Sequence, residues 1–177
     1  MNKYGIATEP NTVEFQRTLP GPIERVWEYL TDPEKRSRWF AGGPMELRIK
    51  GKVELRFDHT KITAEPTPEA YRESMAAMPV SVGHITQINA PYRLAYTWWE
   101  DEGDTSEIVF QLSEKGDDVV LHLTHRRLPD RDELLSVSSG WHSHLDLLEE
   151  QLRGTPSEGF WSKFASLRAH YDQELPR

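Results

Sequence analysis

The stretch from Asp130 to Leu152, DRDELLSVSSGWHSHLDLLEEQL, carries the strongest helical pattern in the chain and decides the fold. Its apolar residues follow one another at steps of three and four, so a helix places them all on one face. These residues are Leu134, Val137, Trp141, Leu145, Leu148 and Leu152. The small residues at positions 136 and 138–140 predict that the helix approaches another backbone closely or bends.

Most of the chain before this helix alternates apolar and polar residues with a period of two, which is typical of antiparallel strands with one covered face. Residues 100–104 and 115–118 have the composition of hairpin turns between such strands. A sheet with one apolar face must be covered, and the 130–152 helix is the only predicted element large enough. The apolar positions of the predicted strands are Leu47 and Ile49; Val53, Leu55 and Phe57; Leu94, Tyr96 and Trp98; Ile108, Phe110 and Leu112; and Leu121, Leu123 and His125.

Two short helices are predicted between a first strand at 15–19 and the rest of the sheet. Pro20-Gly21-Pro22 stops that strand, and Pro22 suits the first position of a helix because an N–H there would have no helical partner. Asp32-Pro33 predicts the cap and first residue of the second helix, which we expect to end near Trp39-Phe40. The buried face of the first helix is predicted to hold Ile23, Val26, Trp27 and Leu30.

The segment 58–82 interrupts the predicted sheet and is long for a hairpin loop, and long loops of this kind are usually functional. Tyr71, Met75 and Met78 follow at spacings of four and three on a short helix that Thr67-Pro68 is predicted to cap. Methionine side chains adapt to varied partners. We therefore interpret the segment as a lid over a binding site.

Residues 155–158, Thr-Pro-Ser-Glu, have the pattern of a capping box that begins a last helix. The sequence thus predicts an α+β fold with a curved antiparallel sheet wrapped on a long helix, two short helices after the first strand, and an extra C-terminal helix. We assign residues 1–154 to the main domain and 155–177 to a helix packed on the same domain or on a partner subunit. One side of that helix carries Phe160, Phe164, Leu167, Tyr171 and Leu175.

Composition excludes several classes of protein. The 177 residues hold 21 Lys and Arg against 29 Asp and Glu, a net charge of −8, which argues against binding to nucleic acid or to an anionic membrane surface. The chain has no cysteine, so disulfides and thiolate chemistry are absent. No apolar run approaches the roughly 20 residues of a membrane span, and the first ten residues lack a secretory pattern. We expect a cytoplasmic protein.

Several motifs, in their order and spacing, resemble the helix-grip fold of the START and birch-pollen-allergen-like (SRPBCC) superfamily. Within it the chain is similar to the AHSA-type branch, the homologues of the activator of the heat-shock chaperone ATPase. The resemblance implies a deep cavity between sheet and long helix, where relatives hold apolar ligands, and it implies no defined reaction. The matching motifs are Pro22 to Trp27, Thr31-Asp32-Pro33 with Trp39, Ala90 to Trp98, Leu123-Thr124-His125, and Gly140-Trp141 with Leu145 and Leu148.

The side chains that face inward by strand alternation, together with the resemblance, predict a set of ligand-binding residues. Tyr96 and His125 are interpreted as polar groups that orient a ligand, against the alternative that His125 is a hydrogen-bonded core residue. Trp39 and Phe40, by resemblance, lie near the mouth of the cavity. The full set is Trp39, Phe40, Leu55, Phe57, Tyr96, Trp98, Phe110, His125, Trp141 and Leu145.

Trp98 and Trp99 are adjacent, so in a strand their rings face opposite sides of the sheet. Trp98 shares its phase with the inward residues Leu94 and Tyr96, which leaves Trp99 on the outer face. We expect either a scattered surface aromatic there or a face covered by the last helix or by a second subunit, as in a homodimer.

No motif in the sequence predicts a metal, a cofactor or a catalytic residue. His142 and His144 are two apart, so they do not share a helix face as paired metal ligands do. The acidic residues 100–104 lack the ligand spacing of a calcium loop and are interpreted as a solvated hairpin tip. Nucleophile elbows, phosphate-binding glycine loops and dinucleotide fingerprints are absent.

These observations favour a protein that binds a small apolar molecule, and the lack of a recognisable catalytic motif leans against an enzyme without deciding the question. Two alternatives stay open. One is a protein-interaction module, a cofactor of a heat-shock chaperone or a stress-response accessory. The other is an enzyme of the cyclase or hydrolase kind that uses the same cavity.

Overall fold

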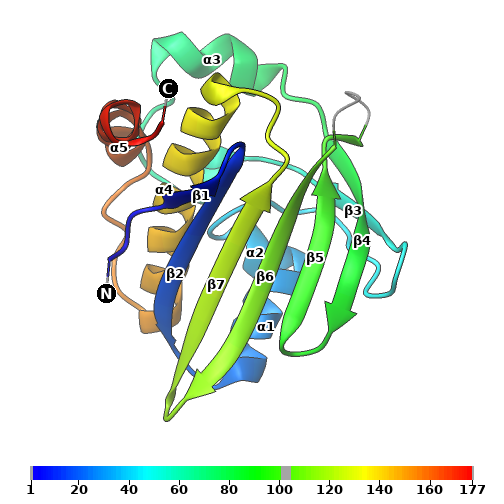
Figure 1. Ribbon diagram of the computed structural model, residues 1–177. Helices are drawn as coiled ribbons and strands as arrows, with labels where there is room; N and C mark the ends of the chain where they lie inside the picture. The colour runs from blue at the N-terminus through cyan, green and yellow to red at the C-terminus, as the bar shows by residue number, and fades with distance from the viewer. Residues whose placement is uncertain (1, 101–104, 177) are drawn as a thin grey trace.

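The computed structural model describes residues 2–100 and 105–176, and it has the predicted α+β helix-grip architecture (Figure 1). Within these residues seven strands form one antiparallel sheet in the order β1-β2-β7-β6-β5-β4-β3. The strands are β1 (Ile6–Glu9), β2 (Thr12–Pro20), β3 (Lys52–Leu55), β4 (Ser81–Asn89), β5 (Arg93–Trp98), β6 (Ser106–Lys115) and β7 (Asp118–Arg126). The helices are α1 (Ile23–Thr31), α2 (Pro33–Ser37), the 3-10 turn η1 (His59–Lys61), α3 (Glu69–Ala76), α4 (Arg131–Arg153) and α5 (Trp161–Glu174).

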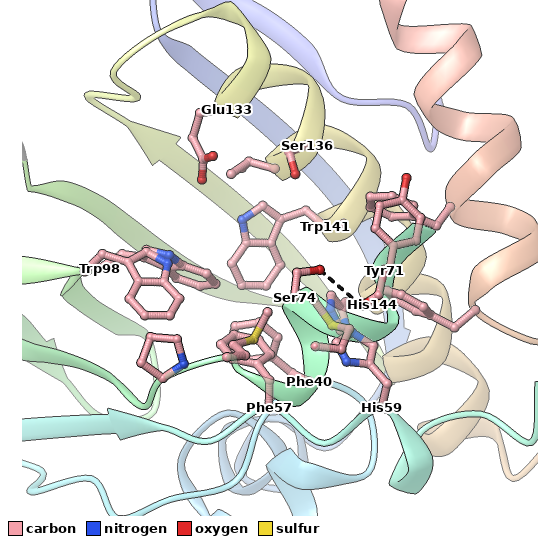
Figure 2. A pocket seen from close by; sticks show the side chains of 18 of the residues that line it. Phe40, Phe57, His59, Tyr71, Ser74, Trp98, Glu133, Ser136, Trp141 and His144 are labelled. Atoms are coloured by element: carbon pink, nitrogen blue, oxygen red, sulfur yellow. Dashed lines mark hydrogen bonds between the residues drawn. The ribbon is translucent and has the colours of Figure 1, made fainter. Parts of the chain in front are cut away.

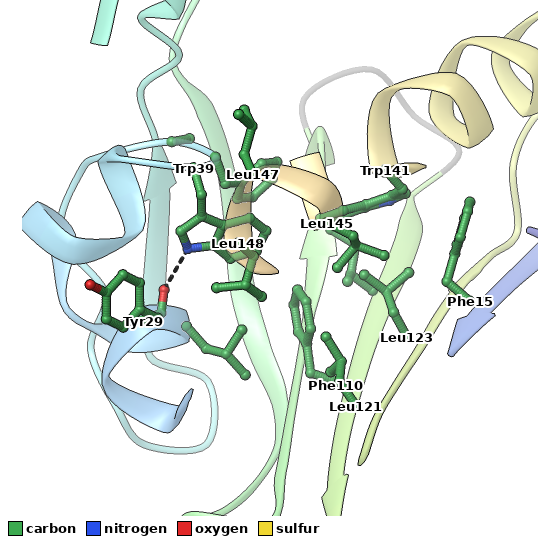
Figure 3. Packing of buried hydrophobic residues seen from close by; sticks show 14 of the residues in the cluster. Phe15, Tyr29, Trp39, Phe110, Leu121, Leu123, Trp141, Leu145, Leu147 and Leu148 are labelled. Atoms are coloured by element: carbon green, nitrogen blue, oxygen red, sulfur yellow. Dashed lines mark hydrogen bonds between the residues drawn. The ribbon is translucent and has the colours of Figure 1, made fainter. Parts of the chain in front are cut away.

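Helix α4 covers one face of the sheet, as its sequence pattern predicts (Figure 1). Asp130 caps its start by accepting a hydrogen bond from the Glu133 N–H at 2.9 Å, and Gly154 ends it in the left-handed conformation with φ 68°. The six apolar residues of the predicted face are all buried. They meet Phe15, Phe110, Leu121 and Leu123 of the sheet in one hydrophobic core (Figure 3).

The first two helices position Trp39 and Phe40 next to α4. The Asp32 carboxylate caps α2 by accepting the Lys35 N–H at 2.8 Å, as predicted, but the helix ends at Ser37, two residues before Trp39. The buried Arg36 guanidinium donates to the Ala41 carbonyl at 2.8 Å, which fixes the turn after the helix. The Trp39 indole N–H donates to the Tyr29 carbonyl at 2.8 Å (Figure 3), so Trp39 is part of the core.

The sheet contains strands that sequence periodicity did not predict, β1 and β4. The predicted strand at Leu47 and Ile49 is wrong, because the backbone folds there into a tight loop. The Arg48 N–H donates to the Glu46 carbonyl, and Gly51 allows a close approach, since a Cβ at that position would lie 2.0 Å from the Glu46 carbonyl oxygen. Leu47 and Ile49 are consequently about half exposed, at 48% and 52%. The turn between β6 and β7 falls at Gly116, as expected.

Helix α5 packs against α4 of its own chain, beside β1 and away from the outer face of the sheet (Figure 1). It begins at Trp161, so the predicted capping box at 155–158 is wrong. The cap comes instead from Glu65, whose side-chain oxygen accepts the N–H groups of Phe160 at 2.6 Å and Trp161 at 2.7 Å. Across the described residues no helix has the length and apolar character needed to cross a membrane.

Candidate functional site

A pocket of about 730 Å³ lies between the first half of α4, the ends of β5 and β6, α3 and the start of α5 (Figure 2). From α4 it is lined by Glu133, Ser136, Val137, Gly140, Trp141 and His144. The α3 segment contributes Tyr71, Ser74, Met75, Ala77, Met78 and Pro79. The remaining lining residues are Phe40, Phe57, His59, Trp98, Trp99, Ser106, Pro129, Phe160, Trp161 and Phe164.

The two halves of α4 differ in the side chains that they present, and the pocket lies beside the first half. Its first half turns Ser136 and Gly140 toward the pocket, and a Cβ added at Gly140 would meet nothing within 4 Å. Its second half places Leu145 and Leu148 in direct packing with the sheet, where both are fully buried (Figure 3). The space between helix and sheet is therefore open at one end and filled at the other.

Aromatic residues are the most frequent kind of side chain in the pocket wall. Nine of its 22 described lining residues are Phe, Tyr or Trp. Phe40 lies at the centre of this wall, with its ring centroid 4.8 Å from that of Trp141 and 5.2 Å from that of Phe57. On the opposite side Tyr71 stacks on Trp161 at 5.5 Å with an interplanar angle of 14°. The wall thus combines rings from α3, α4, α5, β5 and the loops after α2 and β3.

His125 lies behind this wall, in the core. The Trp141 indole N–H donates to His125 Nδ1 at 3.0 Å, and because indole nitrogen only donates, Nδ1 carries no proton. Nε2 therefore carries the proton and donates to the Ser106 hydroxyl oxygen at 2.8 Å. Complete burial lowers the pKa of His125 to about 3, so the ring is neutral at ordinary pH. Both ring nitrogens of His125 are occupied by hydrogen bonds to neighbouring side chains. This agrees with the alternative that His125 is a hydrogen-bonded core residue.

Two histidines, His59 and His144, line the pocket itself, and both rings are uncharged. His144 Nδ1 donates to the Trp39 carbonyl at 2.7 Å, and burial lowers its pKa to about 3. Burial also lowers the pKa of His59, whose ring centroid lies 6.0 Å from that of His144. His142, on another face of α4, hydrogen-bonds the Tyr171 hydroxyl at 2.9 Å instead. In the described ranges no three His, Asp or Glu residues are grouped closely enough to hold a metal ion.

The two adjacent tryptophans both reach the pocket. Strand β5 ends at Trp98, and Trp99 has a left-handed backbone with φ 54°. The alternation of a strand no longer applies after that point, so the two rings lie in edge contact at 6.4 Å and both line the pocket. The prediction that Trp99 lies on the outer face is wrong. Of the acidic residues 100–104, predicted as a solvated hairpin tip, all but Glu100 fall outside the described residues, and Glu100 hydrogen-bonds His84 Nδ1 at 2.6 Å.

The structure separates the ten predicted ligand-binding residues into two groups. Phe40, Phe57, Trp98 and Trp141 line the pocket. The other six lie in the core, outside the pocket lining: Trp39, Leu55, Tyr96, Phe110, His125 and Leu145. A role in binding stays a prediction for the first group and has no direct geometric support for the second.

Sequence reasoning missed the contribution of the chain's end. Phe160, Trp161 and Phe164 form part of the wall, whereas the sequence predicts only that their helix packs on the same domain or on a partner subunit and gives it no part in the pocket. The α3 segment does lie against the pocket with Tyr71, Met75 and Met78, where the lid interpretation places it. No local sequence signal locates α5 there, because its cap, Glu65, is one of several acidic residues in the 58–82 segment.

Comparisons with known proteins agree with this geometry. The family model for Activator of Hsp90 ATPase homolog 1-like proteins matches residues 20–153. The solution NMR structure of the protein encoded by gene BPP1335 from Bordetella parapertussis has a TM-score of 0.83 and 39% identity, covering 99% of this chain and 92% of that chain. The crystal structure of CalU16 from Micromonospora echinospora has a TM-score of 0.68 and 26% identity, covering 92% and 86%.

A more distant structure shares the fold alone. The solution structure of the Aha1 dimer from Colwellia psychrerythraea has a TM-score of 0.59 and 13% identity, covering 80% of this chain and 95% of that chain. A comparison with curated proteins finds no match.

Proposed function

We propose that this chain, which belongs to the family of Activator of Hsp90 ATPase homolog 1-like proteins, binds a small apolar molecule in the pocket between α4 and the sheet. One observation carries the proposal: the pocket has about 730 Å³ of space, and nine of its described lining residues are Phe, Tyr or Trp. Ligand sites are typically about 300–1,000 Å³ and predominantly apolar, with a few polar groups that fix orientation.

Binding would work by removing apolar surface from water. Each buried methylene of a ligand contributes about 0.8 kcal/mol, and contact with aromatic rings adds to this. Polar groups of the lining that can orient a ligand include the hydroxyls of Ser74 and Ser136, the rings of His59 and His144, and the indole N–H groups of Trp98 and Trp161. Because both histidines are neutral, they exchange single hydrogen bonds with a ligand and do not require a counter-charge.

The test is to fill the pocket without disturbing the fold. Gly140→Phe places a ring in open space and also removes a glycine from a helix interior, so the protein should stay folded. We expect its affinity for the neutral fluorescent probe N-phenyl-1-naphthylamine to fall at least tenfold relative to the wild type. Gly140→Ala is the matched control, since one methyl group leaves most of the pocket empty.

A folded Gly140→Phe variant that binds the probe as tightly as the wild type would overturn the proposal. Native mass spectrometry supplies a second measurement, because a molecule bound in the cell should add its mass to the freshly purified wild type. The same added mass should be missing from Gly140→Phe.

A second function, interaction with a heat-shock chaperone, is favoured by the description of the matching family model. Such an interaction would use an exposed surface, so it should not respond to a filled pocket. The test is a pull-down with the purified chaperone of the host followed by its ATPase rate. Equal stimulation by the wild type and Gly140→Phe supports this function, and the absence of both capture and stimulation rejects it.

A further inference from the structure

Three hydrogen-bond donors in the pocket lining have no acceptor among the described residues. The indole nitrogens of Trp98 and Trp161 are buried and make no hydrogen bond there, although an indole N–H can only donate. The third donor is the hydroxyl of Ser106, a residue with 5% of its surface exposed. Buried donors are nearly always paired, so three unpaired donors in one pocket point to what the pocket binds.

The Ser106 hydroxyl is free to donate because its oxygen already accepts a hydrogen bond. The Trp141 indole N–H donates to His125 Nδ1 at 3.0 Å, which leaves the proton of the neutral ring on Nε2. Nε2 donates that proton to the Ser106 oxygen at 2.8 Å and has no lone pair to take the hydroxyl proton in return. Ser106 is therefore not a nucleophile activated by His125. Its O–H has no other hydrogen-bond partner in the described part of the chain.

Two of the three donors, from Trp98 and Ser106, belong to one wall of the pocket. These residues are register partners on β5 and β6, and directly opposite residues of an antiparallel pair carry their side chains on the same face, with Cβ atoms about 4.5–5.5 Å apart. The Trp98 ring lies 6.0 Å from that of Trp141. Figure 2 shows both rings on the side of the pocket away from Tyr71.

We propose that the pocket binds apolar molecules that carry a carbonyl oxygen, as ketones and quinones do, and that the Ser106 hydroxyl and the Trp98 indole N–H donate to this oxygen. This inference rests on the proposed function and names the polar group of its ligand. A carbonyl oxygen has two lone pairs and no proton, so it can accept from both donors. An alcohol suits them less, because its own proton needs an acceptor that neither donor supplies. Trp161 offers a third donor for an acceptor oxygen at the α5 wall.

Selection for the carbonyl follows from the cost of an unpaired donor. A buried donor without an acceptor costs free energy, and a ligand that supplies the acceptor removes this cost. A hydrocarbon of the same shape covers the donors and leaves them unpaired, which is how a polar site rejects an analogue that lacks the matching group. The aromatic residues of the lining contact both kinds of molecule, so they contribute affinity without distinguishing between them.

Two compounds with the same ring skeleton test the inference, since fluoren-9-one has a carbonyl group where fluorene has a methylene group. Each is titrated as a competitor of bound N-phenyl-1-naphthylamine. We expect Ser106→Ala to weaken binding of fluoren-9-one at least threefold and to change binding of fluorene by less than twofold. Trp98→Phe also removes ring area, which affects both compounds, so its loss should be at least threefold larger for the ketone than for the hydrocarbon.

The controls make the same substitutions outside the pocket lining. Ser113→Ala changes an exposed serine on the same strand as Ser106, and Trp27→Phe changes a half-buried tryptophan on α1. Both variants should bind the two compounds as the wild type does.

Infrared spectroscopy supplies a measurement that does not depend on a variant's stability. The carbonyl stretch of fluoren-9-one bound to the wild type should lie at a lower wavenumber than in acetonitrile, a solvent that does not donate hydrogen bonds. In Ser106→Ala the band should move back toward its position in that solvent. A band at the acetonitrile position in the wild-type complex would overturn the inference.

The outcomes separate this inference from the proposed function. If the wild type binds neither N-phenyl-1-naphthylamine nor the two compounds, the proposed function fails and the inference fails with it. If the amine binds but fluoren-9-one does not displace it, or if Ser106→Ala and Trp98→Phe affect both compounds equally, the carbonyl assignment is overturned and the proposed function stands. A selective loss of the ketone in Trp161→Phe alone would likewise overturn the assignment to the β5 and β6 wall.

Discussion

A side-chain oxygen of Glu65 accepts the backbone N–H of Trp161 at 2.7 Å, which ties the segment that carries α3 to the first turn of α5. The same oxygen accepts the Phe160 N–H at 2.6 Å. Gly159 makes this approach feasible, since it has φ 100° and a Cβ there would lie 2.8 Å from the Glu65 carboxyl carbon. Both segments line the pocket, so one carboxylate holds two of its walls together.

Replacement of this carboxylate should loosen both walls. We expect Glu65→Ala to lower the free energy of unfolding by about 1–2 kcal/mol, the usual cost of losing a helix cap. Limited proteolysis should then cut residues 58–82 faster than in the wild type. Glu69→Ala, at an exposed position on α3, is the control and should change neither measurement. Equal stability and equal cutting rates in Glu65→Ala would contradict the role given to Glu65.

The buried histidines predict a loss of stability on acidification. Burial lowers the pKa of His125 and of His144 to about 3, whereas the unfolded chain takes up these protons near pH 6.5. Between those values the unfolded state binds more protons, so the free energy of unfolding decreases as the pH falls below 6.5. Each histidine contributes up to about 1.4 kcal/mol per pH unit.

This dependence can be measured by urea unfolding from pH 7 to pH 5. His125→Asn removes one titrating ring, so the slope of stability against pH should become shallower by up to about 1.4 kcal/mol per unit. The slope is informative even though the variant is less stable overall. A slope identical to that of the wild type would mean that His125 does not resist protonation.

Gly140 should be a site where stability can be gained. A glycine in a helix interior costs about 1 kcal/mol relative to alanine, and the added methyl group meets nothing within 4 Å. Gly140→Ala is therefore expected to raise the free energy of unfolding by about 1 kcal/mol in chemical denaturation. A decrease would show that the space beside α4 is smaller than the structure indicates.

The core and wall groups of predicted site residues should respond differently to truncation. Leu145 is fully buried between α4 and the sheet, so Leu145→Ala is expected to cost about 2–5 kcal/mol of stability. Phe57 is half-buried at the pocket wall, so Phe57→Ala should cost less than half as much and should weaken probe binding at least threefold. The reverse ranking of the two stability losses would contradict the separation of core from wall.

The sequence predicted the long helix and the central strands well, because their apolar residues recur at regular spacing. The 3.6-residue pattern of α4 and the two-residue patterns of β5, β6 and β7 each describe one face of one element, and those faces meet in the core. Periodicity identifies which way a side chain points. It does not tell whether the space in front of it is filled, which is why Leu145 and Phe57 were placed in the same predicted site.

The remaining differences come from interactions between residues distant in sequence. The cap of α5 is 96 positions away from Trp161, at Glu65, so no local motif announces it. Trp99 departs from the strand pattern because its φ is 54°, a backbone conformation that a tryptophan rarely adopts and that alternation does not encode. Strand β4 was missed because its burial alternates over only part of its length.

The family match stops at residue 153, yet Phe160, Trp161 and Phe164 supply one side of the pocket. The family frame and this side of the pocket are thus encoded by separate stretches of the chain. A tail exchanged after residue 153 would remodel that side while leaving the strand pairing of the sheet in place. If such proteins bind ligands in this pocket, we expect their ligand preference to diverge faster through the segment that follows the family match than through the matched sheet and helices.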